Sequence, residues 1–542
     1  MNQRAVGNSL PAEFRAVLED VFQRLDQLND IGSALSVEHD IGLLLEKIVL
    51  AAKQITRADG GTLYLLSNDR HFLHFEIVRT DSLNVAFGGS SPQSASGLFP
   101  NLPLYRADCS PNDSMVAAYA AITGNTVNIA DAYIAQGFDF SGTRQFDART
   151  GYRSQSFLTV PMKDHEGEVI GVLQLINALD PASGQVVSFS AADQRLAESL
   201  ASQAAVALSN RQLVQQLEAL FESFVKLINL AIDEKSPYTG GHCQRVPELT
   251  MMLAEAADAA TEGPLADFKL ADKDRYELRI AALLHDCGKV TTPVHIVDKA
   301  TKLQTLFDRI ELLDTRWEVV RRDAEIRKWR SITEGQAAEA AEHEYQAFCR
   351  QLEIDREHLR QANIGCEKMP DDAAGRVRQI AGHYRWRGAD GTEQAFLSAN
   401  EIENLTIRSG TLTTAERDII NHHIVATIRM LEQLPWPRHL KNVPEYAGGH
   451  HERMDGKGYP RGLKREEMSW QARMMGIADI FEALTAKDRP YKDGMGLAQA
   501  LEILERFSRN GHIDADLYAV FVQGGVFRRY AEAFLRPQQI DC

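Results

Sequence analysis

The sequence has no apolar run long enough to cross a membrane and no closely spaced pair of cysteines. No segment reaches the roughly 18 consecutive apolar residues of a membrane helix, and the opening MNQRAVGNSLPAEF lacks the apolar centre of a signal peptide. The six cysteines are scattered and form no CxxC pair, which favours free thiols in a reducing compartment. These absences predict a cytoplasmic protein with no membrane partner.

A basic surface is also missing. The formal net charge of -16 argues against broad, sequence-independent binding to DNA or RNA, which requires positive charge. It does not exclude a small nucleotide held by local cations and metal ions. At 44% hydrophobic and 25% charged residues, the composition is that of folded domains, and 542 residues predict two or three of them.

Two short segments gather residues that bind metals. Residues 450–460, HHERMDGKGYP, place two adjacent imidazoles and two carboxylates before a Gly-Tyr-Pro turn. Residues 285–289, HDCGK, add a second His-Asp pair upstream. Imidazole and carboxylate together suit borderline and hard cations such as iron, manganese or zinc. The two segments therefore predict a metal site.

The same segments resemble the HD-GYP family, a branch of the HD-domain phosphohydrolases that linearises cyclic di-GMP. The family pattern HHExxDGxGYPxGL is met in full by residues 450–463, and HDxGK by residues 285–289. The resemblance implies a metal-dependent cyclic di-GMP phosphodiesterase, a hydrolase that forms linear pGpG. Whether such an enzyme would go on to GMP is left open by the sequence.

The first part of the chain predicts an α+β domain. Apolar residues at helical spacing predict helices over 11–58. Residues 160–177, VPMKDHEGEVIGVLQLIN, resemble a GAF domain, which implies a regulatory pocket for a small molecule, and 164–167 predict a hairpin turn. Short strands are predicted at 61–66, 72–78, 156–162 and 169–177.

The ligand of this GAF domain is not evident. Cyclic-nucleotide-binding GAF domains carry an N-K…F-x-x-x-D-E pattern, which Asn177, Phe189 and Asp193 meet in part. Ala178 replaces the lysine and Gln194 the glutamate. Because Phe and Asp at this spacing also suit an ordinary helix start, an unknown small-molecule ligand, or none, is favoured over a cyclic nucleotide.

A single long helix is predicted from about 192 to 232. Its apolar residues alternate spacings of four and three, which is typical of a coiled coil. We expect it to form the seam of a parallel homodimer; the alternative is a helix that packs on its own domain. The seam would consist of Leu213, Leu217, Leu220, Phe224, Leu227 and Ala231.

The expected architecture is multidomain, with an α+β GAF sensor domain, a long connecting helix and an all-α HD-GYP catalytic domain. The expected boundaries are a helical segment at 1–35, the GAF domain at 36–191, the coiled-coil helix at 192–232 and the catalytic domain at 233–542.

A charged insertion separates the two metal-binding segments, at about 300–408. Within it, 309–350 is dense in charged residues with a sparse apolar stripe, which is typical of a solvated helical hairpin. Residues 385–394 predict a loop. The sequence leaves the role of the insertion open.

The resemblance also implies a set of ligands from five places in the chain. Some family members carry a third metal on a Glu four residues before the first histidine; Tyr238 occupies that position here, so two divalent ions are expected, most readily iron or manganese. Asp286 is expected to bridge them, because a carboxylate has two oxygens to share. The implied ligands are His242, His285, Asp286, His423, His450, His451 and Asp479.

Two of these assignments need comment. Counting back from residues 430–431 through the family's HPxxGxxIL pattern selects His423 and leaves His422 as the alternative, although Ile424 and Thr427 replace the usual Pro and Gly. Asp479 lies in an apolar segment, where an unpaired carboxylate is costly, so a metal is its natural partner.

Further residues are assigned to catalysis and to the substrate. Lys289, one turn after His285, is expected to act with Asp286 in catalysis by stabilising phosphate charge or protonating the leaving oxygen. The alternative is a helix-end lysine. Glu452 and Asp455 are expected to position the loop. The expected substrate contacts are Lys289, Gly458, Tyr459, and Arg489 and Lys492 of a DRPYK segment.

Two other functions remain compatible with the sequence. One is a catalytically silent receptor for a cyclic dinucleotide, which missing ligands would favour, yet all seven positions are filled. The other is an HD phosphohydrolase for another nucleotide, such as cyclic GMP-AMP. The sequence does not decide between the two cyclic dinucleotides or identify the metal.

Overall fold

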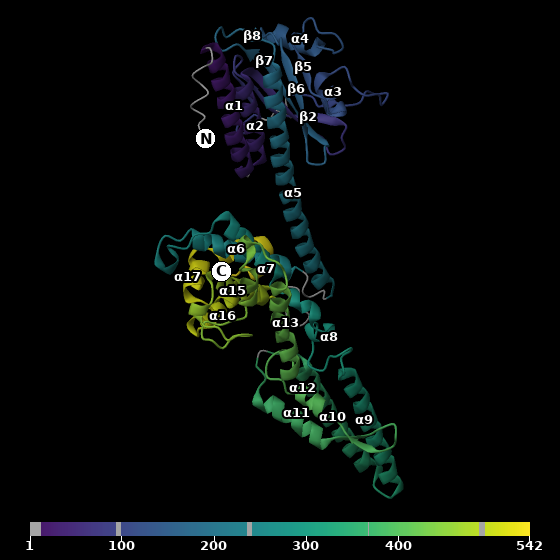
Figure 1. Cartoon of the computed structure of the whole chain (residues 1–542). Helices are drawn as coiled ribbons and strands as arrows, with labels where there is room; N and C mark the ends of the chain where they lie inside the picture. Colours follow the sequence, from purple (N-terminus) through teal and green to yellow (C-terminus); the bar gives the residue numbers. More distant parts are fainter. Residues whose placement is uncertain (1–11, 39, 94–98, 236–240, 367, 487–493) are drawn as a thin grey trace. The chain divides into compact units, whose positions relative to one another are not determined.

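A computed structural model of the chain describes residues 12–38, 40–93, 99–235, 241–366, 368–486 and 494–542 (Figure 1). Tyr238, Arg489 and Lys492 lie outside these residues. The chain divides into two compact units, 1–220 and 221–542. Within the described ranges, no helix combines the length and apolarity needed to span a membrane.

An antiparallel sheet forms the centre of the first unit. Its strands follow the order β3-β2-β1-β7-β6-β5, with β4 beside β2 and β8 beside β7. The central pair is in register at Leu63 opposite Leu173, both fully buried. The strands are β1 (Ala58–Leu66), β2 (Phe72–Thr80), β3 (Val85–Phe87), β4 (Leu102–Pro103), β5 (Val127–Ile129), β6 (Phe157–Lys163), β7 (Val169–Leu179) and β8 (Val186–Val187).

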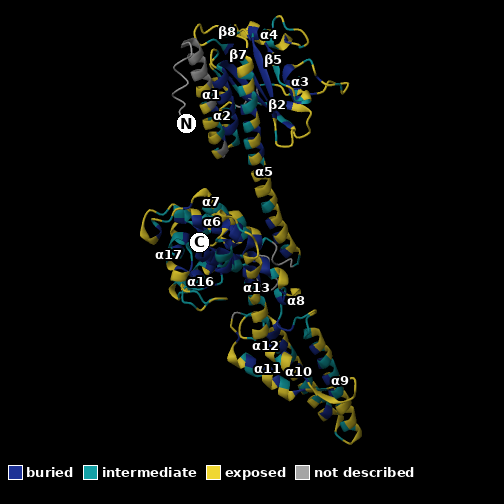
Figure 2. Ribbon diagram, viewed as in Figure 1, coloured by how far each residue is buried: buried dark blue, intermediate teal, exposed yellow. Residues whose placement is uncertain are grey.

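Helices cover this sheet, and their apolar faces explain its burial (Figure 2). One core joins the sheet to the first two helices and the start of α5, and a smaller one packs α3 against it. This arrangement confirms the predicted α+β domain. The helices are α1 (Ala12–Val37), α2 (Ile41–Thr56), α3 (Val116–Thr123), α4 (Ser141–Thr150) and α5 (Ala191–Lys235).

The residues that match part of the cyclic-nucleotide pattern have structural partners. The side chain of Asn177 accepts backbone N–H groups of Gln155 and Ser156. Asp193 accepts hydrogen bonds from Ser190 at the start of α5 and pairs with Arg24 at 2.7 Å. These contacts account for both residues without a nucleotide.

Helix α5 carries an apolar stripe that the single chain leaves exposed. Five of the predicted seam residues, Leu213, Leu217, Leu220, Phe224 and Leu227, are between 47% and 64% exposed, and Ala231 is exposed as well. The dimer seam stays a prediction.

The second unit is mainly helical (Figure 1), and its helices outside the insertion pack around one large core. Its main helices are α6 (His242–Asp258), α7 (Asp272–Leu284), α8 (Val294–Val297), α13 (Thr414–Glu432), α14 (Val443–Gly448), α15 (Trp470–Thr485), α16 (Leu497–Arg509), α17 (Ala515–Gln523) and α18 (Val526–Phe534). Short 3-10 helices are η2 (Gly263–Leu265), η3 (Cys287–Thr291), η4 (Arg438–Leu440), η5 (Arg465–Glu467) and η6 (Pro537–Gln539).

The insertion is more than the predicted solvated hairpin. The two long helices are present, but they pack with later elements around a core of their own in which Trp317 contacts Tyr384 and Phe396. The predicted loop at 385–394 is wrong at its ends, which pair as a two-stranded hairpin. The elements are α9 (Ile310–Thr333), α10 (Ala338–Asn363), α11 (Asp371–His383), β9 (Arg385–Arg387), β10 (Glu393–Ala395) and α12 (Ala399–Leu405).

The exposed stripe of α5 gives a first test. Leu217→Glu should convert dimers to monomers in light scattering, because like charges would face each other across a coiled-coil seam. Gln215→Glu, an exposed position off the stripe, is the control and should leave the mass unchanged. A wild-type chain that is monomeric at micromolar concentration would contradict the seam.

Candidate metal centre

The seven ligands expected from the sequence lie together in the second unit. Their donor atoms form three overlapping groups, in each of which all atoms lie within 4.8 Å of one another. Because His285 and His450 each belong to two groups, the seven residues are one connected cluster. The groups are His423, His450 and His451; His242, His285 and Asp479; and His285, Asp286 and His450.

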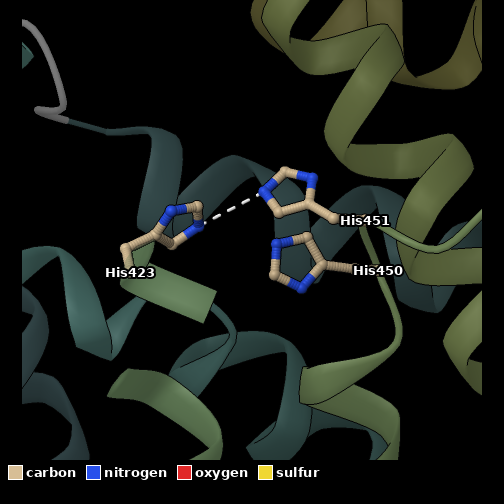
Figure 3. Close-up of side chains that lie close together, drawn as sticks. All are labelled: His423, His450 and His451. Atoms are coloured by element: carbon tan, nitrogen blue, oxygen red, sulfur yellow. Dashed lines mark hydrogen bonds between the residues drawn. The ribbon is translucent and has the colours of Figure 1, made fainter. Parts of the chain in front are cut away.

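Five segments supply these side chains. His242 begins α6, and Asp479 lies within α15. His285 ends α7, and Asp286 follows it before the 3-10 helix. Figure 3 shows His423 opposite His450 and His451, which follow α14, with His423 and His451 joined by a contact of 3.2 Å between their Nε2 atoms. The neighbouring His422 is exposed.

Backbone carbonyls set the orientation of three imidazoles. His285, His423 and His450 each donate from Nδ1 to the carbonyl oxygen three residues earlier, at 2.7, 2.6 and 2.6 Å. A carbonyl only accepts, so Nδ1 carries the proton of each neutral ring. The Nε2 lone pair is left to face the cluster, as in a metal-ligating histidine.

A carboxylate that sequence reasoning missed orients the fourth imidazole. His242 donates from Nδ1 to Glu482 Oε2 at 2.5 Å, and Arg245 pairs with the other oxygen of Glu482 at 2.7 Å. Glu482 lies three residues after Asp479 and so shares its face of α15. The three-residue spacing from Asp479 could have indicated Glu482 as a member of the site, but Glu482 belongs to none of the sequence motifs.

Asp286 lies between imidazoles from several helices. Its Oδ2 is 3.1 Å from His242 Nε2 and 3.2 Å from His285 Nε2, and its Oδ1 is 3.2 Å from His423 Nε2. The two oxygens thus face different members of the cluster, which is the geometry of a carboxylate shared by two cations.

Two buried atoms of the cluster lack hydrogen bonds among the described residues. They are Asp286 Oδ1 and His450 Nε2. Buried polar atoms of this kind are costly unless something satisfies them. Both are acceptors, and the Nε2 atoms of His285 and His242 also approach each other to 3.4 Å. Converging lone pairs are satisfied by cations, so the donor set fits divalent metal ions.

Four of the donors, His450, His451, Asp286 and Asp479, are in the protonation state that metals require. Burial lowers the pKa of His451 to about 4 and that of His450 well below its usual value, so both rings are neutral. Burial alone would raise the pKa of Asp286, but Lys289 and His285 lower it well below its usual range. For Asp479, too, burial is outweighed, by His242, and its pKa is well below the usual range.

His242 differs from these four donors. Its burial disfavours the charged ring, but Glu482, Asp286 and Asp479 outweigh that effect and raise its pKa well above the usual value. Without a metal ion, His242 therefore holds a proton that a cation has to displace.

Lys289 and Tyr459 border the cluster. Lys289 Nζ lies 2.5 Å from Asp286 Oδ2. Its burial would lower its pKa, but Asp286 and Asp479 raise it, so the ammonium stays charged. Tyr459 stacks on His451, with ring centroids 4.9 Å apart. Both side chains therefore lie against residues of the cluster, and their expected roles in substrate binding stay predictions.

Residues of the loop after His451 stabilise its conformation through contacts with one another. Glu452 accepts the backbone N–H groups of Arg461 and Leu463 at 2.7 and 2.9 Å. A Cβ at Gly458 would overlap the backbone of Glu452 and Arg453. This close approach explains the glycine without a substrate contact, and its expected role in substrate binding stays a prediction.

Gly288 also allows a close backbone approach, here between the segments that carry Asp286 and His423. A Cβ there would overlap the carbonyl oxygen of His423 and the backbone of Thr427. The N–H of Gly288 donates to the Thr427 hydroxyl at 2.9 Å. Thr427, one of the departures from the family pattern, thus joins α13 to the segment that carries Asp286.

A cavity of about 290 Å³ opens beside His450 and His451. Arg453, Lys457 and Arg473 line it among others. Glu452 lines it too, and Arg453 and Arg473 are paired with Asp455 and Asp514, so the charges of the lining are mixed. Arg489 and Lys492, the other expected substrate contacts, lie outside the described residues.

Comparison with protein families agrees with this layout. A family model described as GAF domain matches residues 40–208. Two models described as HD domain match residues 239–349 and 395–517. The unmatched stretch between them falls within the insertion.

Curated relatives match parts of the chain. A 3'3'-cGAMP-specific phosphodiesterase of Vibrio cholerae is 26% identical over 56% of this chain and 38% of its own length. Cyclic di-GMP phosphodiesterases of Pseudomonas aeruginosa and Thermotoga maritima are 37% and 36% identical over 21% and 20% of this chain, and 27% and 28% of their own lengths. The matches thus span well under two thirds of each relative.

Solved structures match part of the chain. The GAF domain of an Acinetobacter phosphoenolpyruvate-protein phosphotransferase aligns over 36% of this chain and 98% of its own, with 18% identity and a TM-score of 0.26.

The packing of Gly288 gives a second test. Gly288→Ala should displace Asp286 from His423, lower the metal content per chain and destabilise the unit by about 1–3 kcal/mol through overpacking. The matched control is Gly375→Ala in α11, where a Cβ meets nothing within 4 Å. Elemental analysis and thermal unfolding measure both effects. A Gly288→Ala protein with its full metal complement would contradict this role.

The proton on His242 gives a third. A raised pKa means that the metal-free ring is protonated at neutral pH, so binding of Mn²⁺ should release a proton and weaken by up to about ten-fold per pH unit as the pH falls. Calorimetry in buffers of different ionisation enthalpy counts the protons. Glu482→Gln should reduce the release, since it removes the main cause of the raised pKa. Metal binding that is independent of pH between about 6 and 8 would exclude this linkage.

Proposed function

We propose that this chain, which combines a GAF domain with an HD region of the HD-GYP type, is a metal-dependent phosphodiesterase that hydrolyses cyclic di-GMP to linear pGpG. The observation that carries the proposal is the single buried cluster of seven donors bordered by a charged lysine. The curated relatives, which act on cyclic dinucleotides by their names, support the same class of substrate.

The cluster offers two sets of ligands. His242, His285 and Asp479 would hold one ion, and His423, His450 and His451 the other, with Asp286 between them. Iron or manganese suits this mixture of imidazole and carboxylate. Bound divalent ions would lower the pKa of water toward neutral and stabilise negative charge on phosphate.

Lys289 supplies a proton and a positive charge at the same place. Hydrolysis forms a bond from water oxygen to phosphorus and breaks the ester bond to the ribose oxygen, which needs a proton as it leaves. The Lys289 ammonium stays charged beside Asp286 and is able to give that proton or to balance charge on the phosphoryl oxygens.

Each part of the chain is given a role according to its position in the sequence. We assign residues 36–191 to a GAF domain that regulates the enzyme through an unidentified small molecule, 192–232 to a coiled-coil helix of a homodimer, and 233–542 to catalysis. The partly exposed stripe on α5 supports the dimer.

Cyclic GMP-AMP is the second candidate substrate. It is favoured by one observation: the Vibrio cholerae relative that matches over 302 residues is named as specific for 3'3'-cGAMP. The two substrates differ in one base, so the metal cluster does not discriminate between them.

One experiment separates these functions. The full chain is purified without oxygen, loaded with iron or manganese, and incubated with cyclic di-GMP and with 3'3'-cGAMP while products are followed by chromatography. We expect pGpG from cyclic di-GMP and no turnover by His285→Ala. Faster cleavage of 3'3'-cGAMP than of cyclic di-GMP would identify cGAMP as the substrate. Binding of either dinucleotide without cleavage by metal-loaded protein would identify the chain as a receptor.

Lys289 allows a sharper test of catalysis. Lys289→Ala should slow turnover by about 10²–10⁴-fold with near-normal metal content, as expected for a lost proton donor or charge stabiliser. Lys273→Ala, at an exposed site on α7, is the control. A loss below a few-fold would make Lys289 a helix-end lysine.

A further inference from the structure

A buried ion pair joins the two helices that carry His242 and Asp479. Arg245 of α6 contacts Glu482 of α15, with its Nε and Nη2 atoms each 2.7 Å from the same carboxylate oxygen. The two side chains are only 15% and 1% exposed. The other oxygen of Glu482 accepts the Nδ1 proton of His242 at 2.5 Å. One carboxylate therefore links a ligand of the cluster to an arginine on the same helix.

This ion pair repeats the spacing of the two ligands. On α6, Arg245 follows His242 by three residues. On α15, Glu482 follows Asp479 by three residues. Side chains at this spacing share one face of a helix. The ligands approach each other to 3.3 Å between His242 Nε2 and Asp479 Oδ1, so the two helices meet at two points about one turn apart, which restricts both sliding and rotation.

The start of α6 leaves room for the guanidinium. Gly241, the residue before the helix, has a φ of 87°, a left-handed conformation that residues with a Cβ rarely adopt. A Cβ at Gly241 would lie 2.4 Å from Nη1 of Arg245. The glycine therefore allows Arg245 to lie next to the turn that begins with His242.

The donor group on the other side of the cluster is oriented in a different way. His423 and His450 each donate from Nδ1 to a carbonyl oxygen of their own segment, at 2.6 Å in both cases. These contacts involve neither α6 nor α15. Loss of the ion pair should therefore weaken the donor group that contains His242 and spare the one that contains His423.

We propose that Arg245 is a positioning residue of the metal centre, which acts through Glu482 to hold His242 and Asp479 together for one of the two ions. The inference deepens the proposed function and rests on its metal centre. A guanidinium has no lone pair to give to a metal, so replacing Arg245 weakens an ion without removing a donor atom. Outer contacts of this kind change metal affinity by about 10–100-fold.

Binding of Mn²⁺ to the full chain tests this role. Metal-free protein is titrated with Mn²⁺ alone, and free Mn²⁺ is quantified by electron paramagnetic resonance, which gives the number of bound ions and their Kd values. Wild-type protein should bind two ions. Arg245→Met should leave the Kd of one ion unchanged and raise that of the other by about 10–100-fold.

Another buried ion pair supplies a matched control. In the insertion, Arg316 contacts Glu401 at 2.8 Å, and these side chains are 18% and 3% exposed. Arg316→Met should destabilise the protein as Arg245→Met does, because each leaves a buried carboxylate without its arginine. Both ions should nevertheless bind to Arg316→Met with wild-type Kd values. Thermal unfolding and the titration together separate a loss of stability from a loss of position.

Further variants identify the affected ion. In His423→Ala protein, which keeps the donor group of His242, adding Arg245→Met should weaken the remaining ion. In Asp479→Ala protein, which keeps the donor group of His423, the same addition should leave the Kd unchanged. Arg245→Lys should give an intermediate loss confined to one ion, because an ammonium restores the charge but not both N–H contacts.

Two unchanged ions in Arg245→Met would overturn the proposal, and equal weakening of both ions would make Arg245 a general packing residue. If Arg245→Met does not fold, Arg245→Lys decides, since a loss confined to one ion is still required. Wild-type protein that binds no Mn²⁺ would refute both proposals. Wild-type protein that binds two ions but cleaves neither cyclic di-GMP nor 3'3'-cGAMP would refute the phosphodiesterase alone, because the role of Arg245 is measured by metal binding.

Discussion

The convergence of buried lone pairs on one point is the constraint around which the helical unit is arranged. The Nε2 atoms of His242, His285 and His423 and the carboxylate oxygens of Asp286 lie 3.1–3.4 Å from one another. Such a cluster costs free energy unless a cation lies in it. Its neighbours have to hold it together while metal is absent, and the Glu482–His242 and Lys289–Asp286 pairs supply charges of the opposite sign.

Close backbone approach is what allows that convergence. Gly288 lies against His423 and Thr427, and a Cβ at Gly476 would lie 2.9 Å from the carbonyl oxygen of His450. Both contacts bring a ligand-bearing segment next to another helix. Gly288 of the HDxGK motif and Gly476 of α15 are therefore explained by packing between ligand-bearing segments. Thr427 is explained in the same way, because its hydroxyl accepts the Gly288 N–H.

The sequence motifs were sufficient to predict the metal-binding residues. They were not sufficient to predict residues whose partners are brought close only by folding. His423 could be chosen over His422 by spacing, and the structure buries the former and exposes the latter. Glu482 had no motif, because its partner His242 is 240 residues away. The core of the insertion was missed since its apolar residues are few per helix, and Trp317 meets Tyr384 and Phe396 only after folding.

The insertion is tied to the helix that carries His423 by a buried ion pair. Glu416 accepts the backbone N–H of Thr413 at the start of α13 and, with the same carboxylate, holds Lys299 at the base of the insertion. The Thr411 hydroxyl donates to the carbonyl oxygen of Lys299 and fixes the loop a second time. This pair is expensive to break, because the Lys299 ammonium alone would be left buried and uncompensated. The insertion therefore joins the helices of the metal cluster through a fixed connection at the first turn of α13, about two helical turns from His423.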